Sequence, residues 1–440
     1  MDRTDWIGET YTSRLGRDLL FDLSEIGARL AASEGEREGH DRLAEAFEES
    51  GVRDVHAHEF EIPRWERGTS RFSIDVPRER AFDVISLPGS PAGEAEGEVV
   101  HLGYGLPEEF ERSDLEGKIV VARSDAPSHH RWMHRREKYF RAYEAGAAAF
   151  VYQNHVPGCL PPTGSLGGGT DVMGPLPAVG ISAEEGERLA QYARVGSIEG
   201  RVSVDVTVGD GISRNTIGTV GPATEEEVLV GAHVDGHDIS EGALDNASGV
   251  AVLAEVARAL VRIEADLETR VRLVGFGAEE LGLIGSQTYA DEHDLGGTKL
   301  VVNCDGAGRA RDMAVRTCGF EGVAEVLEEV GSEYDQPIDR IPGVNPHSDH
   351  WPFVWRGVPG VQVRSVTGEG RGFGHTFADT FDKTDTRAVR EHAILTTALV
   401  ERVADPGTEI VSRSVDSIRE ELEAKELDVS MRVAGDWPYE

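Results

Sequence analysis

Cysteine is scarce in this chain of 440 residues, which contains only three: Cys159, Cys304 and Cys318. They are widely spaced and none has a CxxC partner, which excludes a disulfide framework and a cysteine-rich zinc finger. Long apolar runs are also missing: no stretch of about 18 uncharged apolar residues occurs. The N-terminal segment carries charges throughout, which excludes the apolar core of a signal peptide. We therefore expect a cytoplasmic protein with reduced thiols and no association with a membrane.

Basic residues are also few. The sequence has 44 Lys and Arg against 80 Asp and Glu, a net charge of -36, and only five of the basic residues are lysine. Because no basic stripe is present to neutralise phosphates, we expect no nucleic-acid partner. An excess of carboxylates repels itself in dilute buffer and is screened in concentrated salt. The composition therefore predicts a halophilic source, with an ordinary acidic protein as the alternative.

Four regions of different texture follow one another along the chain. Helical periodicity covers residues 15–50 and ends at Gly51, and strand-like runs follow at 55–62 and 72–76. A module of short strands and glycine-rich loops occupies 86–207. Strands and helices then alternate over 208–405, and a charged tail with one short helix at 418–427 fills 406–440. Strands separated by helices predict a mixed, mostly parallel sheet in an α/β fold, covered on both faces.

Ligand-type side chains stand where the strands of the third region end, and this is the edge at which an open α/β sheet binds its ligands. They are His233 and Asp235 after one strand, Asp245 before a helix, Glu279 and Glu280 after the next strand, Asp305 after another, and His375 in a glycine-rich loop.

Imidazole and carboxylate ligands without thiolates suit catalytic zinc, or cobalt or manganese. Five of these residues are candidate ligands: His233, Asp245, Glu280, Asp305 and His375. Two histidines and three carboxylates exceed the needs of one four-coordinate ion, and fit two ions about 3.5–4 Å apart that share a carboxylate. Asp245 is the natural bridge. Because adjacent side chains diverge, one of Glu279 and Glu280 would bind metal while the other serves as general base. Structural roles stay open on this evidence alone: Asp245, for example, could cap the helix that begins near Ala247.

Six blocks in this order resemble the metal-binding signatures of the co-catalytic zinc aminopeptidase and glutamate carboxypeptidase family. They are Gly-Ala-His-Val-Asp-Gly at 231–236, Gly-Ala-Leu-Asp-Asn-Ala-Ser-Gly-Val-Ala at 242–251, Phe-Gly-Ala-Glu-Glu-Leu-Gly-Leu-Ile-Gly-Ser at 276–286, Val-Asn-Cys-Asp-Gly at 302–306, Ser-Asp-His-Trp-Pro-Phe at 348–353 and His-Thr-Phe-Ala-Asp-Thr at 375–380. The resemblance implies a three-layer α/β/α, phosphorylase/hydrolase-like peptidase domain that holds two Zn²⁺ and acts on peptides.

The same resemblance assigns roles to single residues. His233 and Asp305 would bind one ion, Glu280 and His375 the other, and Asp245 would bridge them. Glu279 would be the general base. Asp235 would orient the ring of His233, and Asp379 would support His375 in the same way.

The middle module is similar to the protease-associated domain through Leu115–Val121, Ala145–Val151 and Leu176–Ile181. This implies a small β-rich insert at 86–207 within a peptidase domain formed by 1–85 and 208–405. For the histidines at 129, 130 and 134 we expect a solvated helix rather than a second metal site.

One position departs from the family pattern. Many relatives carry a tyrosine directly before the last metal histidine, and Gly374 stands there in this chain. We expect an exopeptidase, with an aminopeptidase favoured because a carboxylate-rich pocket attracts an ammonium group. A carboxypeptidase would need a cation for the substrate carboxylate, which Arg364 or Arg371 could supply. A non-catalytic receptor and a single-zinc glutaminyl cyclase are further alternatives, and homo-oligomerisation is left open.

Overall fold

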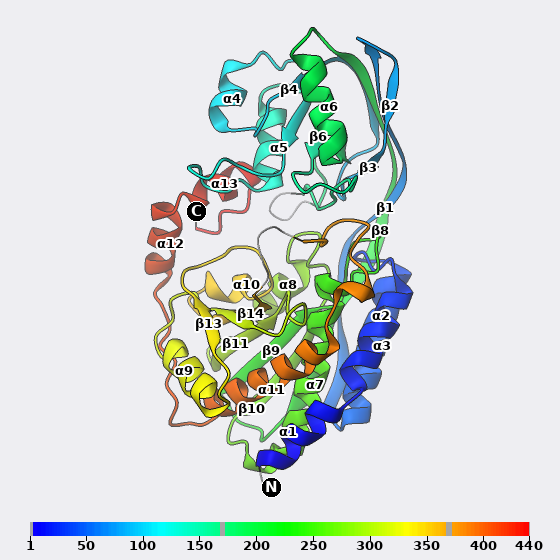
Figure 1. Ribbon diagram of the computed structural model, residues 1–440. Helices are drawn as coiled ribbons and strands as arrows, with labels where there is room; N and C mark the ends of the chain where they lie inside the picture. Colours follow the sequence, from blue (N-terminus) through cyan, green and yellow to red (C-terminus); the bar gives the residue numbers. More distant parts are fainter. Residues whose placement is uncertain (1–2, 168–171, 367–371, 440) are drawn as a thin grey trace. The chain divides into compact units, whose positions relative to one another are not determined.

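The computed structural model describes residues 3–167, 172–366 and 372–439 (Figure 1). Two compact units share the chain. Unit 1 comprises Met1–Ile62, Gly211–Glu369 and Asp379–Glu421, and unit 2 comprises Pro63–Asp210, Gly370–Ala378 and Leu422–Glu440. The predicted insert at 86–207 falls within the longest stretch of unit 2, and the four predicted domain boundaries remain predictions.

Unit 1 is built on a mixed sheet whose centre is parallel. The strand order is β13-β12-β14-β11-β9-β10-β8. Strands β10, β9, β11 and β14 run parallel, whereas β8 and β12 pair antiparallel with β10 and β14. The bounds are β8 (Glu199–Val220), β9 (Glu227–His233), β10 (Arg270–Phe276), β11 (Thr298–Cys304), β12 (Met313–Arg316), β13 (Ile338–Ile341) and β14 (Gly360–Ser365).

Helices cover both faces of this sheet. As a result, successive residues of the central strand β9 are all buried, although their side chains point to opposite faces. One face packs against α7, which is itself covered by α2, α3 and α11, and the other face meets Tyr289 of α8 and Phe353 of α10. The predicted three-layer α/β fold is thereby confirmed. The helices are α1 (Arg3–Thr12), α2 (Leu15–Ile26), α3 (Glu34–Ser50), α7 (Ser248–Arg262), α8 (Ile284–Glu292), α9 (Val323–Glu333), α10 (Trp351–Val354), α11 (Thr386–Val403) and α12 (Val415–Ala424), with one-turn helices at Ala243–Ala247, Glu264–Asp266 and Phe381–Lys383.

Helix α3 begins and ends where its sequence predicts. The hydroxyl of Ser33 accepts a hydrogen bond from the backbone N–H of Glu36 and caps the first turn. Gly51 ends the helix in the left-handed conformation with φ of 89°, which costs glycine little. The strand expectations downstream were wrong in one respect: the two runs at 55–62 and 72–76 form a single strand, β1 (Arg53–Val76).

In unit 2 the strands follow one another in the order β8-β4-β5-β6-β7-β3, with β4 to β7 parallel. The two faces of these strands carry separate apolar clusters, one around Ile119 and Val179 and the other around Tyr139 and Phe150. The elements are β2 (Arg80–Phe82), β3 (Val84–Ser86), β4 (Gly93–His101), β5 (Ile119–Arg123), β6 (Ala149–Gln153), β7 (Ala178–Ile181), α4 (Pro107–Arg112), α5 (Arg135–Glu144), α6 (Ala183–Ala193) and α13 (Leu427–Ala434).

Two local expectations in these regions were wrong. Helix α5 begins at Arg135, after the three histidines, and it is not simply solvated, because Glu137 and Lys138 are buried. Buried Glu137 is ion-paired with Arg131 and Arg141, which explains how its charge is tolerated. The predicted tail helix at 418–427 is two helices, α12 and α13, separated at Glu426, which adopts a positive φ of 56°.

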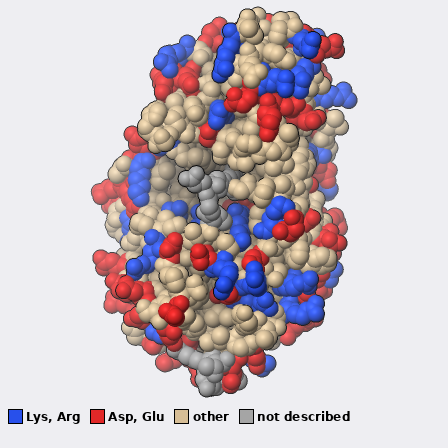
Figure 2. All heavy atoms as spheres, viewed as in Figure 1, with Lys and Arg blue, Asp and Glu red and all other residues tan. Residues whose placement is uncertain are grey.

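Across the described ranges, no helix is both long and apolar enough to cross a membrane. Figure 2 shows acidic and basic groups interspersed among other residues on the face in view. Many of the arginines form ion pairs, such as Arg311 with Glu391 at 2.7 Å.

Candidate metal centre

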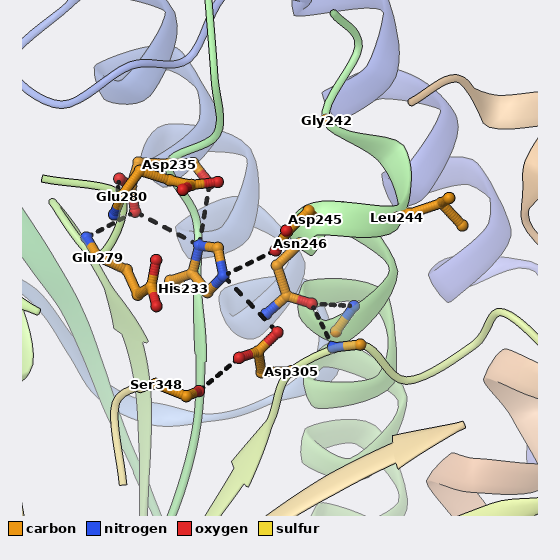
Figure 3. Close-up of polar contacts among 12 residues, drawn as sticks. His233, Asp235, Gly242, Leu244, Asp245, Asn246, Glu279, Glu280, Asp305 and Ser348 are labelled. Carbon is orange, nitrogen blue, oxygen red and sulfur yellow. Dashed lines mark hydrogen bonds and ion pairs between the residues drawn. The ribbon is translucent and has the colours of Figure 1, made fainter. Parts of the chain in front are cut away.

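His233 is the central residue of the candidate site. It is the last residue of β9 and its side chain is 1% exposed. The ring nitrogen Nδ1 lies 3.1 Å from the backbone oxygen of Asp235 and 3.5 Å from the Oδ1 atom of the same residue. These contacts fix the ring from one side and leave Nε2 facing the other side (Figure 3).

Two carboxylates lie on that other side. Nε2 of His233 is 3.4 Å from Oδ1 of Asp245 and 4.0 Å from Oδ1 of Asp305, and it has no hydrogen-bond partner. Ligand atoms around a tetrahedral ion with bonds of about 2.0–2.1 Å are separated by about 3.3 Å. A buried imidazole nitrogen at this spacing from two carboxylates therefore fits a metal site better than it fits a hydrogen-bonded pair.

Glu279 and Glu280 follow β10 in a turn whose backbone is held by Asp235. The two Asp235 oxygens accept hydrogen bonds from the N–H groups of Glu279 and Glu280 at 3.1 and 3.0 Å. Ligand atoms of His233, Glu279 and Asp305 all lie within 4.8 Å of one another. Asp235 therefore contacts both the histidine and the acidic pair, which is more than the ring-orienting role expected from the sequence.

Asp305 is held by a serine that precedes α10 and by a glutamine of the neighbouring strand β14. The hydroxyl of Ser348 and the amide of Gln362 both donate to its Oδ2 atom, the latter at 3.1 Å. Asn303 in turn donates to Ser348 at 2.6 Å. The sequence interpretation gave Ser348 no chemistry, whereas the structure makes it a support of a candidate ligand.

Asp245 lies in a tight turn just before α7 rather than at its cap, which is Ala247. The carboxylate of Asp379 accepts hydrogen bonds from the backbone N–H groups of Leu244 at 2.6 Å and Asp245 at 3.1 Å. Asp379 thus positions the turn that carries Asp245, whereas the sequence placed it behind His375.

Sequence reasoning missed a histidine close to Glu280. Nε2 of His237 lies 2.9 Å from Oε2 of Glu280, and both side chains are almost fully buried. The signal was present, because His237 follows His233 by four residues at the same strand end.

His375 belongs to the segment Gly370–Ala378, which groups with unit 2, and its assignment as a ligand remains a prediction.

Arg29 was also missed, because it comes from the N-terminal part of the chain. Its guanidinium is fully buried and donates to the carbonyls of Leu23, Val234, Glu241 and Gly242 at 2.5–3.1 Å. Burial lowers its pKa to about 10, and the nearby charges of Asp379, Asp235 and Glu280 oppose this change. Arg29 therefore fixes the segment after β9 and places a positive charge behind the acidic cluster.

Glu36, at the start of α3, supports the turn after β10 that carries Glu279 and Glu280. It accepts hydrogen bonds from the N–H of Ala278 at 3.0 Å and the hydroxyl of Ser213 at 2.6 Å. Burial, followed by the charge of Asp235, raises its pKa to about 8. No sequence pattern pointed to Glu36 beyond its place in a helix cap.

The electrostatics of the cluster indicate that a cation belongs there. Burial raises the pKa of Glu279 well above its ordinary value; His233 lowers it, and Glu280, Asp349 and Asp305 raise it further. Burial would lower the pKa of His233, but the carboxylates around it, Glu279 first, raise that pKa well above its ordinary value. So many carboxylates in one buried cluster repel each other, and divalent ions offset that repulsion. The imidazole and carboxylate donors fit a zinc-type metal ion.

Comparisons with known proteins bear on this geometry. The model of "Peptidase family M28" matches residues 215–400, which include every ligand and the base predicted from the sequence, and the PA domain model matches 95–189. Residues 215–400 are therefore similar to peptidase family M28. A PA domain is inserted ahead of them, as the sequence predicted.

Relatives of known activity align along most of the chain. Aminopeptidase YwaD of Bacillus subtilis is 29% identical over 92% of this chain and 87% of its own length. Carboxypeptidase Q of Rattus norvegicus is 26% identical over 89% and 84%. The crystal structure of BSAP, a zinc aminopeptidase from Bacillus subtilis, superposes with a TM-score of 0.71 at 26% identity, covering 90% of this chain and 94% of that one.

Proposed function

We propose that the protein is a zinc-dependent exopeptidase, most simply an aminopeptidase, that uses two metal ions. The observation that carries the proposal is the Nε2 atom of His233, buried, without a hydrogen-bond partner, and 3.4 Å from a carboxylate oxygen of Asp245. The match of residues 215–400 to peptidase family M28 and the similarity of the chain to a zinc aminopeptidase structure support this function. His233 and Asp305 would hold one ion, Glu280 and His375 the other, and Asp245 would contact both.

The bound ions would polarise the scissile carbonyl and lower the pKa of water. The remaining work falls to side chains of the chain. Glu279 would accept the proton of the attacking water and return it to the departing amine, and its proximity to His233 and Asp305 supports this role. Asp235 keeps this carboxylate in place through the backbone of residue 279, and Ser348 and Gln362 keep Asp305 in place.

Aminopeptidase action is favoured over carboxypeptidase action because an ammonium group suits a pocket rich in carboxylates. The similarity to carboxypeptidase Q makes the second activity the alternative. Of the cations considered for it from the sequence, Arg364 lies on β14, and Arg371 lies outside the described residues.

Metal analysis together with a peptide panel tests the proposal. Protein purified in concentrated salt should contain close to two zinc ions per chain, and chelation should abolish hydrolysis until zinc is restored. Leu-Ala-amide should be cleaved, whereas N-acetyl-Leu-Ala should not. Cleavage of the N-acetylated peptide alone would replace the aminopeptidase with a carboxypeptidase. A chain that binds no metal and cleaves neither peptide would contradict both.

A further inference from the structure

His237 is a buried histidine of the candidate metal centre that the ligand assignment does not use. Its Nε2 atom lies 2.9 Å from Oε2 of Glu280, and the two side chains are 2% and 3% exposed. Both residues belong to one group of side chains whose ligand atoms could hold a metal ion. Glu280 is proposed to bind one of two ions, whereas His237 has no role in that assignment.

The backbone on both sides of His237 is fixed by Arg29. The guanidinium donates to the carbonyls of Val234 and Gly242 at 3.1 and 3.0 Å. The N–H of Gly236 in turn donates to the carbonyl of Arg29 at 3.1 Å. The imidazole is therefore carried by a segment that is supported at several points, which is the kind of support that a preorganised ligand requires.

Glu280 is fixed separately, by Asp235. The Oδ2 atom of Asp235 accepts a hydrogen bond from the N–H of Glu280 at 3.0 Å (Figure 3). The Oδ1 atom of the same carboxylate lies 3.5 Å from Nδ1 of His233, the central residue of the site. His237 and Glu280 thus meet on two backbone segments that are each held by a buried charged side chain.

A second histidine–glutamate contact in the chain differs in its surroundings. Nε2 of His58 lies 2.8 Å from Oε2 of Glu292, whose side chain is 60% exposed, so solvent screens that pair. Glu280 is almost fully buried next to Glu279, and a buried carboxylate needs a cation close by. A proton shared with His237 would supply one positive charge there, whereas a divalent ion supplies two.

We propose that His237 is a ligand of the ion assigned to Glu280, in addition to the five ligands predicted from the sequence. With His375 and Asp245 this ion would have two imidazole and two carboxylate donors, which is the number that closes a zinc site. The other ion would keep three donors from the chain. The additional imidazole also favours zinc or cobalt over manganese. This inference rests on the proposed two-metal peptidase function.

Zinc binding by variants of His237 tests the assignment. The full chain, freed of metal, is titrated with zinc in competition with a chelator, which gives the affinity of each ion. His237→Gln and His237→Ala should each keep one ion and bind the other more than about 100-fold more weakly, because even a group that only supports a ligand is worth about 10–100-fold. The ion that is kept shows that the variant has folded.

Glutamine distinguishes a ligand from a hydrogen-bond donor, because its amide can still donate to Glu280 but is a poor ligand for zinc. Wild-type affinity for both ions in His237→Gln would overturn the inference, whether or not His237→Ala is weakened, since His237 would then only position Glu280. Loss of both ions from the two variants would overturn it as well, because His237 would then support the whole centre.

His58→Gln is the matched control. It removes a histidine–glutamate contact of similar length outside the centre, and it should keep both ions with wild-type affinity. The wild type separates this inference from the proposed function. Wild-type protein that binds fewer than two zinc ions and does not hydrolyse Leu-4-nitroanilide would overturn the two-metal peptidase itself. Two ions in the wild type whose affinities do not respond to His237→Gln would overturn only the role of His237.

Discussion

Asp379 holds Asp245 across 134 residues of sequence, because its Oδ2 atom accepts the backbone N–H of Asp245 at 3.1 Å. Its other oxygen accepts the N–H of Leu244. Both oxygens of a buried carboxylate are thus used to position the residue proposed to bridge two ions. Burial, followed by the charge of Asp245, raises the pKa of Asp379 to about 7.

Asp379→Asn should weaken metal binding without removing any proposed ligand. An amide has one acceptor oxygen, so one of the two N–H groups would face the NH₂ group and the turn would shift. Loss of such a supporting group lowers metal affinity by about 10–100-fold. Competition with a zinc chelator measures this, and exposed Asp382→Asn is the control. Unchanged zinc affinity would show that the turn holds Asp245 by itself.

Glu279→Gln and Glu280→Gln should have different effects although the residues are adjacent. Glu279→Gln should retain both ions and lower kcat by about 10²–10⁴-fold, the usual contribution of a general base. Glu280→Gln should lose one ion. Metal content and hydrolysis of Leu-4-nitroanilide, measured on the same preparations, separate the two effects. If the metal were lost from Glu279→Gln instead, the assignments of base and ligand would be exchanged.

Arg29→Lys should destabilise the protein although it retains the charge. One ammonium group cannot reach the carbonyls that the guanidinium contacts on both α2 and the segment after β9. Leaving buried groups unpaired costs about 1–3 kcal/mol each. We expect a clear fall in the thermal unfolding midpoint and, because the 234–242 segment loosens, weaker zinc binding. Arg37→Lys, at an exposed position of α3, should change neither.

The buried ring of His40 should make the free energy of unfolding depend on pH. Its ring is fully buried, bonded to Thr216 at 2.9 Å, and burial lowers its pKa to about 3. The unfolded state takes up a proton below about pH 6.5 and the folded state does not, so this residue costs stability as the pH falls.

Between pH 6.5 and 5 the loss attributable to His40 is about 2 kcal/mol. His40→Asn should therefore lose less stability than the wild type over that interval, even if it begins from a lower value. Urea unfolding at both pH values measures the difference. Parallel losses in the two proteins would mean that His40 is protonated in the folded state or that the unfolded state shields it.

The sequence was informative where chemistry is local. Strand ends, the helix stop at Gly51 and the motif around Asp245 each depend on neighbouring residues, and α3 and β9 lie where expected. It was uninformative about Arg29 and Glu36, because each has a partner more than 200 residues away in sequence. Arg29 donates to Val234, and Glu36 accepts from Ala278. His237 was passed over because the family pattern drew attention to His233 alone.

The boundaries of β1 illustrate the same limit. Pro63 and the charged residues after it interrupt the alternation that marks a strand, so two short strands were expected. Pairing with β2 and β8 keeps the backbone extended regardless, giving one strand from Arg53 to Val76. Partners in a sheet decide such cases, and the sequence of one strand does not contain them.

The distance in sequence between Arg29 and Val234 has a consequence for biosynthesis. Ribosomes add about 5–20 residues per second, so Val234 is made roughly 10–40 s after Arg29. During that interval helix α2 has neither α7 to pack against nor the carbonyls that its neighbouring guanidinium requires, while most of residues 63–210 are already complete. The nascent chain therefore carries α2 without its partner α7 through the synthesis of residues 63–210, and the apolar face of α2 is open to a chaperone during that time.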